Sequence, residues 1–333
     1  MRSSSTRATS LRAGLAGLAS ISVLAVATAT AAGPAVATPA DHATSEVAAP
    51  DINVDDVVAH LEELQSIADA NGGNRNTGEP GYQASVDYVQ TKLDAAGYET
   101  RIQEFETAQG TSYNLIADLP GGDEASTVML GGHLDSVGAG PGINDNGTGS
   151  AALIEIAETY AAQNPDGAQH VRFAFWGAEE LGLLGSTHYV ESLSSDEASQ
   201  ISAYANFDML GSPNPGYFVY DDDPSATDLR DDLTELYTAA GTESAYVDVD
   251  GRSDHAAFMQ AGIPTAGTFS GAEELKTKAE AEMWGGEAGA AYDPCYHSAC
   301  DTMDNLDTEA LDVNADVIAA ALWQWTAGST KSQ

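Results

Sequence analysis

Basic side chains are scarce in this chain of 333 residues, which has 12 Lys and Arg against 51 Asp and Glu and a formal net charge of −39 at pH 7. A surface this negative repels nucleic-acid phosphates and anionic membrane surfaces. Nucleic-acid and membrane partners are therefore not expected. Substrates that are cationic or carry a free amine remain compatible with the charge.

Cysteine is almost absent, since Cys295 and Cys300 are the two in the sequence. They are five positions apart and could pair with each other in an exported protein, where disulfides persist. Long apolar runs are also missing after residue 48, so we expect no later segment to span a bilayer.

Residues 1–48 differ in composition from the rest of the chain. Three arginines precede an alanine-rich apolar stretch, and no acidic residue occurs before Asp41. A basic start, an apolar middle and small residues at the cleavage point are typical of a secretory signal. We expect a signal peptide at 1–37, a short pro-segment at 38–48 and one secreted, extracellular domain at 49–333. A membrane anchor is the alternative, which the weak hydrophobicity of the stretch disfavours.

The rest of the chain alternates helical and strand-like patterns. Helical spacing of apolar residues occurs at 54–68, 82–97, 148–162, 182–192, 225–240 and 308–328. Strand-like runs occur at Tyr113–Leu119, Thr127–Gly132, Val171–Trp176, Ala203–Met209 and Tyr217–Tyr220. This alternation predicts an α/β fold, with a central, mostly parallel mixed sheet flanked by helices. No repeat and no long linker divides it, so we expect a single domain.

Potential metal ligands follow three of the strand-like runs. In chain order they are His133 and Asp135, then Glu179 and Glu180, then Asp208. In open α/β sheets, ligands bind beyond the carboxyl ends of the strands. Asp145 in "GPGINDNGTGS" and His297 in "YDPCYHSAC" are further candidates in loops.

Two histidines with several carboxylates suit Zn²⁺, with Mn²⁺ or Co²⁺ as substitutes. The negative charges of Asp145, Glu180 and Asp208 would be balanced by two divalent cations and one hydroxide, so two ions are expected. Glu179 and Glu180 are adjacent, and their side chains point in different directions. One can bind metal while the other acts as a general base, which is the arrangement that metal-assisted hydrolysis needs.

Each of these residues alone has a simpler interpretation. A single histidine is more often packed or at the surface than a ligand, and paired glutamates can mark a helix N-terminus. The hydrolase hypothesis depends on their joint occurrence at strand ends and in Gly-rich turns. Of the other histidines, His60, His170 and His188 are interpreted as structural, and His255 as a pocket wall or an outer partner of the site.

Five segments together resemble a known family. They are "GGHLDSVGAGPGINDNGTGS", "FAFWGAEELGLLGS", "NFDMLGSPNPGYFVYDDDP", "DGRSDHAAF" and "YDPCYHSACDT". They are similar to the secreted dizinc aminopeptidases of the Streptomyces griseus type, in peptidase family twenty-eight, from about Ala49 to the final helix. The resemblance implies a phosphorylase/hydrolase-like α/β fold, two zinc ions and a monomer that removes large hydrophobic residues from free N-termini.

The resemblance also implies roles for individual residues. His133 and Asp208 resemble the ligands of one zinc, Glu180 and His297 those of the other, and Asp145 the carboxylate that bridges both. Glu179 resembles the general base, and Tyr296 the phenol that stabilises the oxyanion. Asp135 resembles the acid that orients His133. Cys295 and Cys300 resemble a disulfide that holds the Tyr296–His297 turn. A structural calcium site would match Asp51, the Ile52 carbonyl, Asp312 and Asp316.

These observations predict a secreted, zinc-dependent exopeptidase that acts on the free N-termini of peptides and proteins. Within enzymes, the alternative is a carboxypeptidase on a related dizinc fold, which would need Arg or Lys near the site. Only Arg252 lies in one of the motifs. A non-catalytic, receptor-like ectodomain of the same fold is the other alternative. Such proteins tend to lose the base or the ligands, and here all are present.

Overall fold

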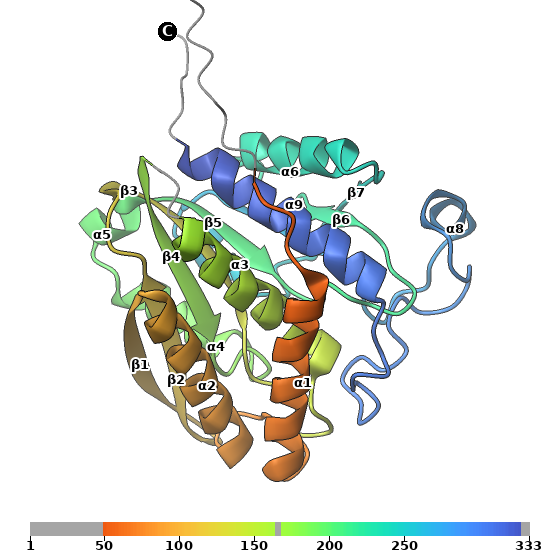
Figure 1. The fold of residues 1–333 in the computed structure, drawn as a ribbon, viewed down its shortest axis with the longest axis horizontal. Helices are drawn as coiled ribbons and strands as arrows, with labels where there is room; N and C mark the ends of the chain where they lie inside the picture. The colour runs from red at the N-terminus through yellow and green to blue at the C-terminus, as the bar shows by residue number, and fades with distance from the viewer. Residues whose placement is uncertain (1–48, 164–167, 328–333) are drawn as a thin grey trace, which may run out of the picture. The chain divides into compact units, whose positions relative to one another are not determined.

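An eight-stranded mixed sheet forms the centre of the molecule in the computed structural model, which describes residues 49–163 and 168–327. The expected signal peptide at 1–37 and pro-segment at 38–48 lie outside the described residues. The strands are β1 (Glu99–Thr107), β2 (Gly110–Asp118), β3 (Asp123–His133), β4 (Gln169–Trp176), β5 (Ile201–Phe207), β6 (Phe218–Tyr220), β7 (Ala245–Val247) and β8 (Thr265–Phe269). Their order is β1-β2-β4-β3-β5-β8-β6-β7 (Figure 1).

The four central strands β4, β3, β5 and β8 are parallel to one another. The antiparallel pairs lie outside this group, with β1 and β2 on one side and β6 against β8 on the other. The carboxyl ends of the central strands therefore meet at one edge of the sheet. This arrangement confirms the expected α/β class and the mostly parallel centre of the sheet.

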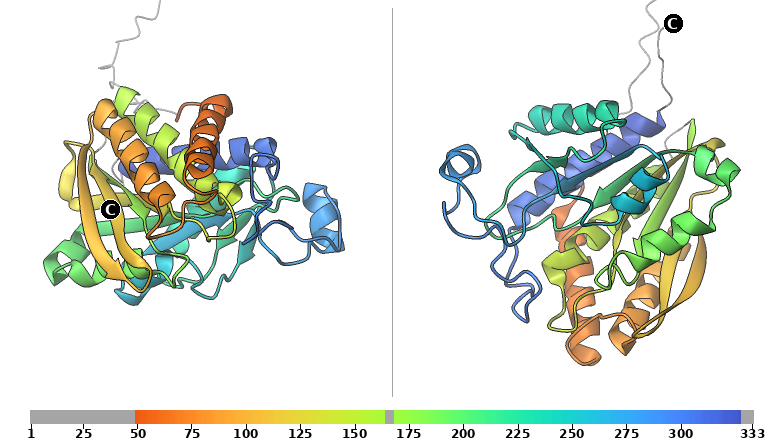
Figure 2. Two further views of the ribbon diagram at one scale, coloured as in Figure 1. Left: turned by 90° about the horizontal axis from the view of Figure 1, so that it is seen from below. Right: turned by 180° about the vertical axis from the view of Figure 1, so that it is seen from behind.

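Helices cover both faces of the sheet (Figure 2). One face carries α1 (Val54–Ala70), α2 (Pro80–Ala96), α3 (Gly149–Gln163), α6 (Thr227–Ala239) and α9 (Thr308–Thr326). The other carries α4 (Leu184–Ser192), α5 (Ser195–Gln200) and α7 (His255–Gln260). The short turn η1 (Ile143–Thr148) leads into α3, and α8 (Lys278–Trp284) lies in a long loop after β8. None of the helices in the described ranges is long and apolar enough to cross a membrane.

The period-two alternation of the strands produces two cores, one on each face of the sheet. In β4, Phe173 and Phe175 pack into the larger core beneath α1, α2, α3 and α9. Ala174 and Trp176 point the other way, into a smaller core that contains Tyr189 of α4. Because both faces are buried, the central strands have nearly continuous apolar sequences, which made them recognisable as strand-like runs.

The expected strands and helices are all present, with small shifts at their ends. Among the strands and α-helices of the described residues, sequence patterns missed six: β1, β7, β8, α5, α7 and α8. β1 is an edge strand of mostly charged and polar residues, so it has little apolar alternation. The other five have three to seven residues each, too few for a period to stand out.

Candidate metal centre

Three neighbouring strands deliver the first set of candidate ligands to one edge of the sheet. His133 is the last residue of β3, and Asp208 directly follows β5. Glu179 and Glu180 lie just beyond β4, after a turn in which Ala178 has a φ of 55°. Since β4, β3 and β5 are adjacent and parallel, these four side chains converge, as the sequence predicts.

Asp145 lies between the two histidines. Its Oδ1 is 3.2 Å from His133 Nε2, and its Oδ2 is 3.2 Å from His297 Nε2. The turn before it requires Gly142, which has a φ of +64° and where a Cβ would lie 2.4 Å from the Asp145 carbonyl oxygen. One carboxylate therefore presents a separate oxygen to each imidazole, as a carboxylate that bridges two metal ions would.

The remaining acids complete one group around each histidine. His133 Nε2 lies 3.4 Å from Asp208 Oδ1 and 3.9 Å from Glu179 Oε2. His297 Nε2 lies 3.0 Å from Glu180 Oε2. The first group contains His133, Glu179 and Asp208, and the second contains Asp145, Glu180 and His297. Within each group every residue offers one ligand atom, and these atoms all lie within 4.8 Å of one another.

Unsatisfied oxygens show that this donor set fits metal ions. Asp145 Oδ2, Glu180 Oε1 and Asp208 Oδ1 are buried and accept no hydrogen bond from the described residues. Buried charged oxygens without partners are costly, and a divalent cation would satisfy all three. Imidazole nitrogens and carboxylate oxygens at these positions suit Zn²⁺.

The electrostatics of the centre agree with this fit. Burial, together with the charge of Asp145, raises the pKa of Glu180 to about 7. Burial alone would lower the pKa of His133, but nearby carboxylates, Asp208 foremost, raise it well above its ordinary value. The protein alone thus favours extra protons at a site crowded with negative charge. Metal ions replace such protons when they bind.

Asp135 contacts His133 through both its backbone carbonyl and its carboxylate. The nearest acceptor to His133 Nδ1 is the backbone carbonyl of Asp135, at 3.0 Å, whereas its carboxylate Oδ1 is 3.7 Å away. A carbonyl can only accept, so Nδ1 carries the proton and Nε2 is left free to bind metal. The carboxylate also accepts from the backbone N–H of Glu179, at 3.1 Å.

A disulfide joins Cys295 and Cys300, as the resemblance implies, and encloses Tyr296 and His297. The rings of Tyr296 and His297 stack with centroids 3.9 Å apart. Asp301, directly after the disulfide, accepts from the backbone N–H groups of Asn144 and Asp145 at 2.7 and 3.0 Å. The loop that carries His297 is thereby fastened to the turn that carries Asp145.

Arg75 is a supporting residue that sequence reasoning missed. It is fully buried, and its guanidinium donates to the carbonyls of Pro141 and Gly142 at 2.9 and 2.6 Å, and to that of Leu134. Burial lowers its pKa to about 10. These carbonyls belong to the segment between His133 and Asp145. Nothing in the local sequence "GGNRNTGEPG" marks the residue, because its partners are backbone atoms 59–67 positions away.

The residues expected to bind calcium connect the start of the domain to α9. The backbone N–H of Ile52 donates to Asp316 Oδ1 at 2.7 Å. Burial, with the charges of Asp51 and Asp312, raises the pKa of Asp316 to about 6. The three acids are therefore neighbours, but they do not form one of the groups whose ligand atoms all lie within 4.8 Å in the described ranges.

A cleft of about 900 Å³ opens over the metal centre. Its floor contains the six residues of the two metal-binding groups, together with Tyr296. Apolar side chains missed by the sequence analysis form its walls: Met209, Phe218, Tyr246, Val247, Phe269 and Leu275. Tyr246 and Val247 lie in β7 and Phe269 lies in β8, two strands that sequence patterns missed, and Leu275 lies in the loop after β8.

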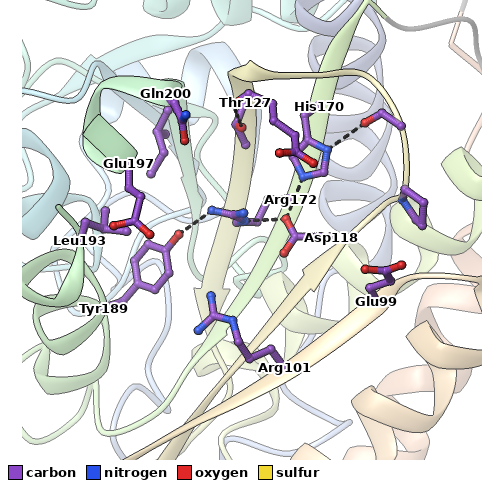
Figure 3. A pocket seen from close by; sticks show the side chains of 14 residues that line it. Glu99, Arg101, Asp118, Thr127, His170, Arg172, Tyr189, Leu193, Glu197 and Gln200 are labelled. Atoms are coloured by element: carbon purple, nitrogen blue, oxygen red, sulfur yellow. Dashed lines mark hydrogen bonds and ion pairs between the residues drawn. The ribbon is translucent and has the colours of Figure 1, made fainter. Parts of the chain in front are cut away.

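A second cavity, of about 430 Å³, lies at the amino ends of β3, β4 and β5, remote in the sheet from the metal centre. Figure 3 shows the side chains that line it. Its Arg172 donates to Asp118 at 2.7 Å, and His170 contacts the same carboxylate at 2.8 Å. These cationic side chains are already paired. Ligands of open α/β sheets bind at the opposite, carboxyl ends of the strands, so the metal-lined cleft is the candidate site.

The histidines outside the centre largely follow the sequence expectations. His170 is held by Asp118, and His188 stacks on Phe105 with centroids 5.1 Å apart, both as structural residues. His255 pairs with Asp222 at 3.3 Å and packs on Tyr220, which lines the cleft. It therefore lies behind the cleft wall.

Comparison with known proteins identifies the family. Residues 114–322 match the model of peptidase family M28. The chain belongs to this family. The family resemblance noted in the sequence is thus confirmed, and it covers the β-strands and loops that carry the candidate ligands.

Family M28 relatives are similar over much of this chain. Leupeptin-inactivating enzyme 1 of Streptomyces exfoliatus is 53% identical over 84% of this chain and 64% of its own length. An aminopeptidase of Pseudomonas aeruginosa is 48% identical over 66% of this chain and 42% of its own. The chain thus spans between about two fifths and two thirds of the length of these relatives.

Solved structures show the same fold. BSAP, a zinc aminopeptidase from Bacillus subtilis, superposes with a TM-score of 0.72 at 18% identity, over 85% of this chain and 97% of that one. An aminopeptidase from an Aneurinibacillus strain gives a TM-score of 0.68 at 19% identity, over 84% and 95%. At this identity the likeness establishes the fold of the domain.

Proposed function

We propose that this protein is a secreted, zinc-dependent aminopeptidase that releases N-terminal residues, preferably large hydrophobic ones, from peptides and proteins. The observation that carries the proposal is the position of Asp145, whose two oxygens each lie 3.2 Å from a different histidine at the base of an open cleft. The names of the relatives, several of which are aminopeptidases, support the same activity.

Two zinc ions would be held by the residues already grouped around the histidines. His133 and Asp208 would bind one, Glu180 and His297 the other, and Asp145 both. When bound, such ions polarise a carbonyl and make an attacking water more acidic.

Glu179 is then free for proton transfer. Its backbone N–H is fixed by Asp135 at 3.1 Å, and its carboxylate faces the same centre as His133. It would take the proton of the attacking water and later give it to the leaving amine. Tyr296, on the disulfide-held loop of the cleft, would donate its phenol proton in a hydrogen bond to the oxyanion that develops at the scissile carbonyl.

The cleft favours an N-terminal over a C-terminal specificity. A free α-amine suits an environment rich in carboxylates, whereas a terminal carboxylate needs an available cation. Arg252 lines the cleft but is paired with Glu273 and Glu274, at 3.0 and 3.3 Å. The ammonium of Lys276 is buried and donates to two backbone carbonyls. Apolar walls that include Phe218 and Leu275 suit a large hydrophobic first side chain.

Secretion, a monomeric state and a structural calcium ion complete the proposal. The composition of residues 1–37 supports export, and the Cys295–Cys300 disulfide is compatible with an oxidising compartment. Calcium would tie Asp51 and Ile52 to Asp312 and Asp316 of α9 through hard oxygen ligands.

The test compares a leucyl chromogenic amide with its N-acetylated form, with and without a chelator. We expect rapid release from the free-amine substrate, little from the acetylated one, loss of activity on chelation and recovery on adding zinc. Equal cleavage of both substrates, or activity that survives complete metal removal, would contradict the proposal. Release of C-terminal residues from an N-blocked peptide would instead support a carboxypeptidase.

A further inference from the structure

A third group of potential metal ligands lies away from the cleft, where three helices of one layer come together. It consists of His60 on α1 and of Glu155 and Glu158 on α3. The glutamates are three positions apart, so they share one face of α3. α1 and α2 both pack against α3 (Figure 1). His60 is 4% exposed, although the sequence shows no partner acid motif beside it and predicted only a structural role.

The distances in this group match those expected around a metal ion. His60 Nε2 lies 3.4 Å from Glu155 Oε2 and 3.6 Å from Glu158 Oε2. Both separations exceed the usual range of N–H···O hydrogen bonds, roughly 2.7–3.2 Å. A tetrahedral ion with bonds of about 2.0–2.1 Å would hold its ligand atoms about 3.3–3.4 Å apart. The histidine–carboxylate separations at the cleft are 3.0–3.4 Å, so the two ranges meet at 3.4 Å.

Each of the three side chains is also held by a second partner at its other polar atom. His60 Nδ1 lies 2.6 Å from the Tyr88 hydroxyl. Glu155 Oε1 accepts from the Thr159 hydroxyl at 3.2 Å, and Glu158 Oε1 pairs with Lys92 at 3.1 Å. His60 Nε2, Glu155 Oε2 and Glu158 Oε2 are left facing one another. Outer partners of this kind orient the ligands of metal sites.

We propose that His60, Glu155 and Glu158 form a third, structural site for a divalent transition-metal ion, with Zn²⁺ the best fit to one imidazole and two carboxylates. Three protein ligands leave a fourth position for water, which the partial exposure of Glu158 permits. The ion would link α1 to α3. Both helices contact η1, the turn that carries Asp145.

The alternative is an ion network without metal, in which a protonated His60 lies between the two glutamates. Such a network would leave Nε2 with one proton to share between two oxygens, at 3.4 and 3.6 Å, longer than most N–H···O hydrogen bonds. The two arrangements predict different zinc contents, so metal analysis distinguishes them.

The experiment measures bound zinc per chain by elemental analysis after equilibrium dialysis at fixed, micromolar free zinc. It compares the full-length wild type with His60→Asn, Glu155→Gln and a matched control, His188→Asn, which removes a histidine that is stacked on Phe105 and has no place in the group. We expect wild type and His188→Asn to bind one zinc more than His60→Asn and Glu155→Gln. The difference is one whatever number of ions the cleft holds, so the outcome is separate from that of the aminopeptidase proposal.

Thermal unfolding provides a second readout, because an ion that binds only the folded chain stabilises it. Added zinc should raise the melting temperature of wild type and His188→Asn more than that of the two site variants. Equal zinc contents in all four proteins would overturn the proposal and assign the group to an ion network. If His60→Asn fails to fold, Glu155→Gln, which keeps the histidine, decides the result alone.

Discussion

The adjacent glutamates should respond differently to the same substitution, because the structure gives them different surroundings. Glu180 Oε2 lies 3.0 Å from His297 Nε2, and its Oε1 is buried without a hydrogen-bond partner in the described residues. Glu179 is the more remote from its histidine, at 3.9 Å, and its position is fixed through its backbone. Replacement by glutamine keeps the size of each side chain and removes only its charge and its ability to accept a proton.

Glu179→Gln should lower turnover roughly 10²–10⁴-fold, the contribution expected of a general base. It should keep both zinc ions, because His133, Asp145 and Asp208 remain in place. Glu180→Gln removes a charged ligand. Loss of an outer partner alone weakens metal binding roughly 10–100-fold, so loss of a direct ligand should cost more than that. Excess zinc should therefore restore part of the activity of Glu180→Gln and none of that of Glu179→Gln.

Zinc content and steady-state turnover of both variants, measured over a range of free zinc, provide the assay. If Glu179→Gln loses zinc while Glu180→Gln keeps it, the two roles are reversed. If both variants retain near-normal turnover, neither glutamate takes part in the chemistry.

Three further outcomes follow from the structure. In Arg75→Lys, the single ammonium nitrogen cannot reach all three carbonyls at once. Losing two hydrogen bonds from a charged donor should lower the free energy of unfolding, measured by urea titration, by roughly 3–6 kcal/mol. Unchanged stability would show that these hydrogen bonds do not hold the segment in place. Calcium added to EGTA-treated protein at constant zinc should raise the melting temperature of wild type but not of Asp316→Asn; no shift in wild type would count against the calcium site. Because salt screens self-repulsion at a net charge of −39, stability should be kept or increased at molar NaCl, and a steady fall in melting temperature would refute this.

Sequence reasoning predicted candidate ligands where regular, buried strands end. His133 ends β3 and Asp208 follows β5, and the buried second half of β3 and most of β5 are rich in small and apolar residues, so the ends of both runs could be located in the sequence. Because β3, β4 and β5 are parallel neighbours, knowing where each strand ended was enough to predict that the side chains meet. Asp145 and His297 lie in loops, and only the family resemblance gave them defined roles.

The supporting contacts could not be predicted in the same way. Arg75 and Asp301 act on backbone carbonyls and N–H groups, which every residue possesses, so no pattern of side chains marks the positions they hold. Asp135 shows the same limit. The resemblance implies that it orients His133, and its carboxylate lies 3.7 Å from His133 Nδ1, but no side-chain pattern reveals that its backbone carbonyl lies nearer, at 3.0 Å.

These backbone contacts explain how loops can hold a metal centre rigidly. Asp145 comes from η1 and His297 from a loop more than 150 positions away, and to hold the proposed metal ions both would have to be placed to within about 0.5 Å. Arg75 fixes the segment before Asp145, and Asp301 binds the N–H of Asp145 itself at the edge of the disulfide loop. Since the two ligands are joined through one carboxylate, a change at Asp301 should disturb both histidine–Asp145 separations together. The candidate centre therefore combines side chains at the ends of β3, β4 and β5 with side chains from two loops that backbone contacts hold in place.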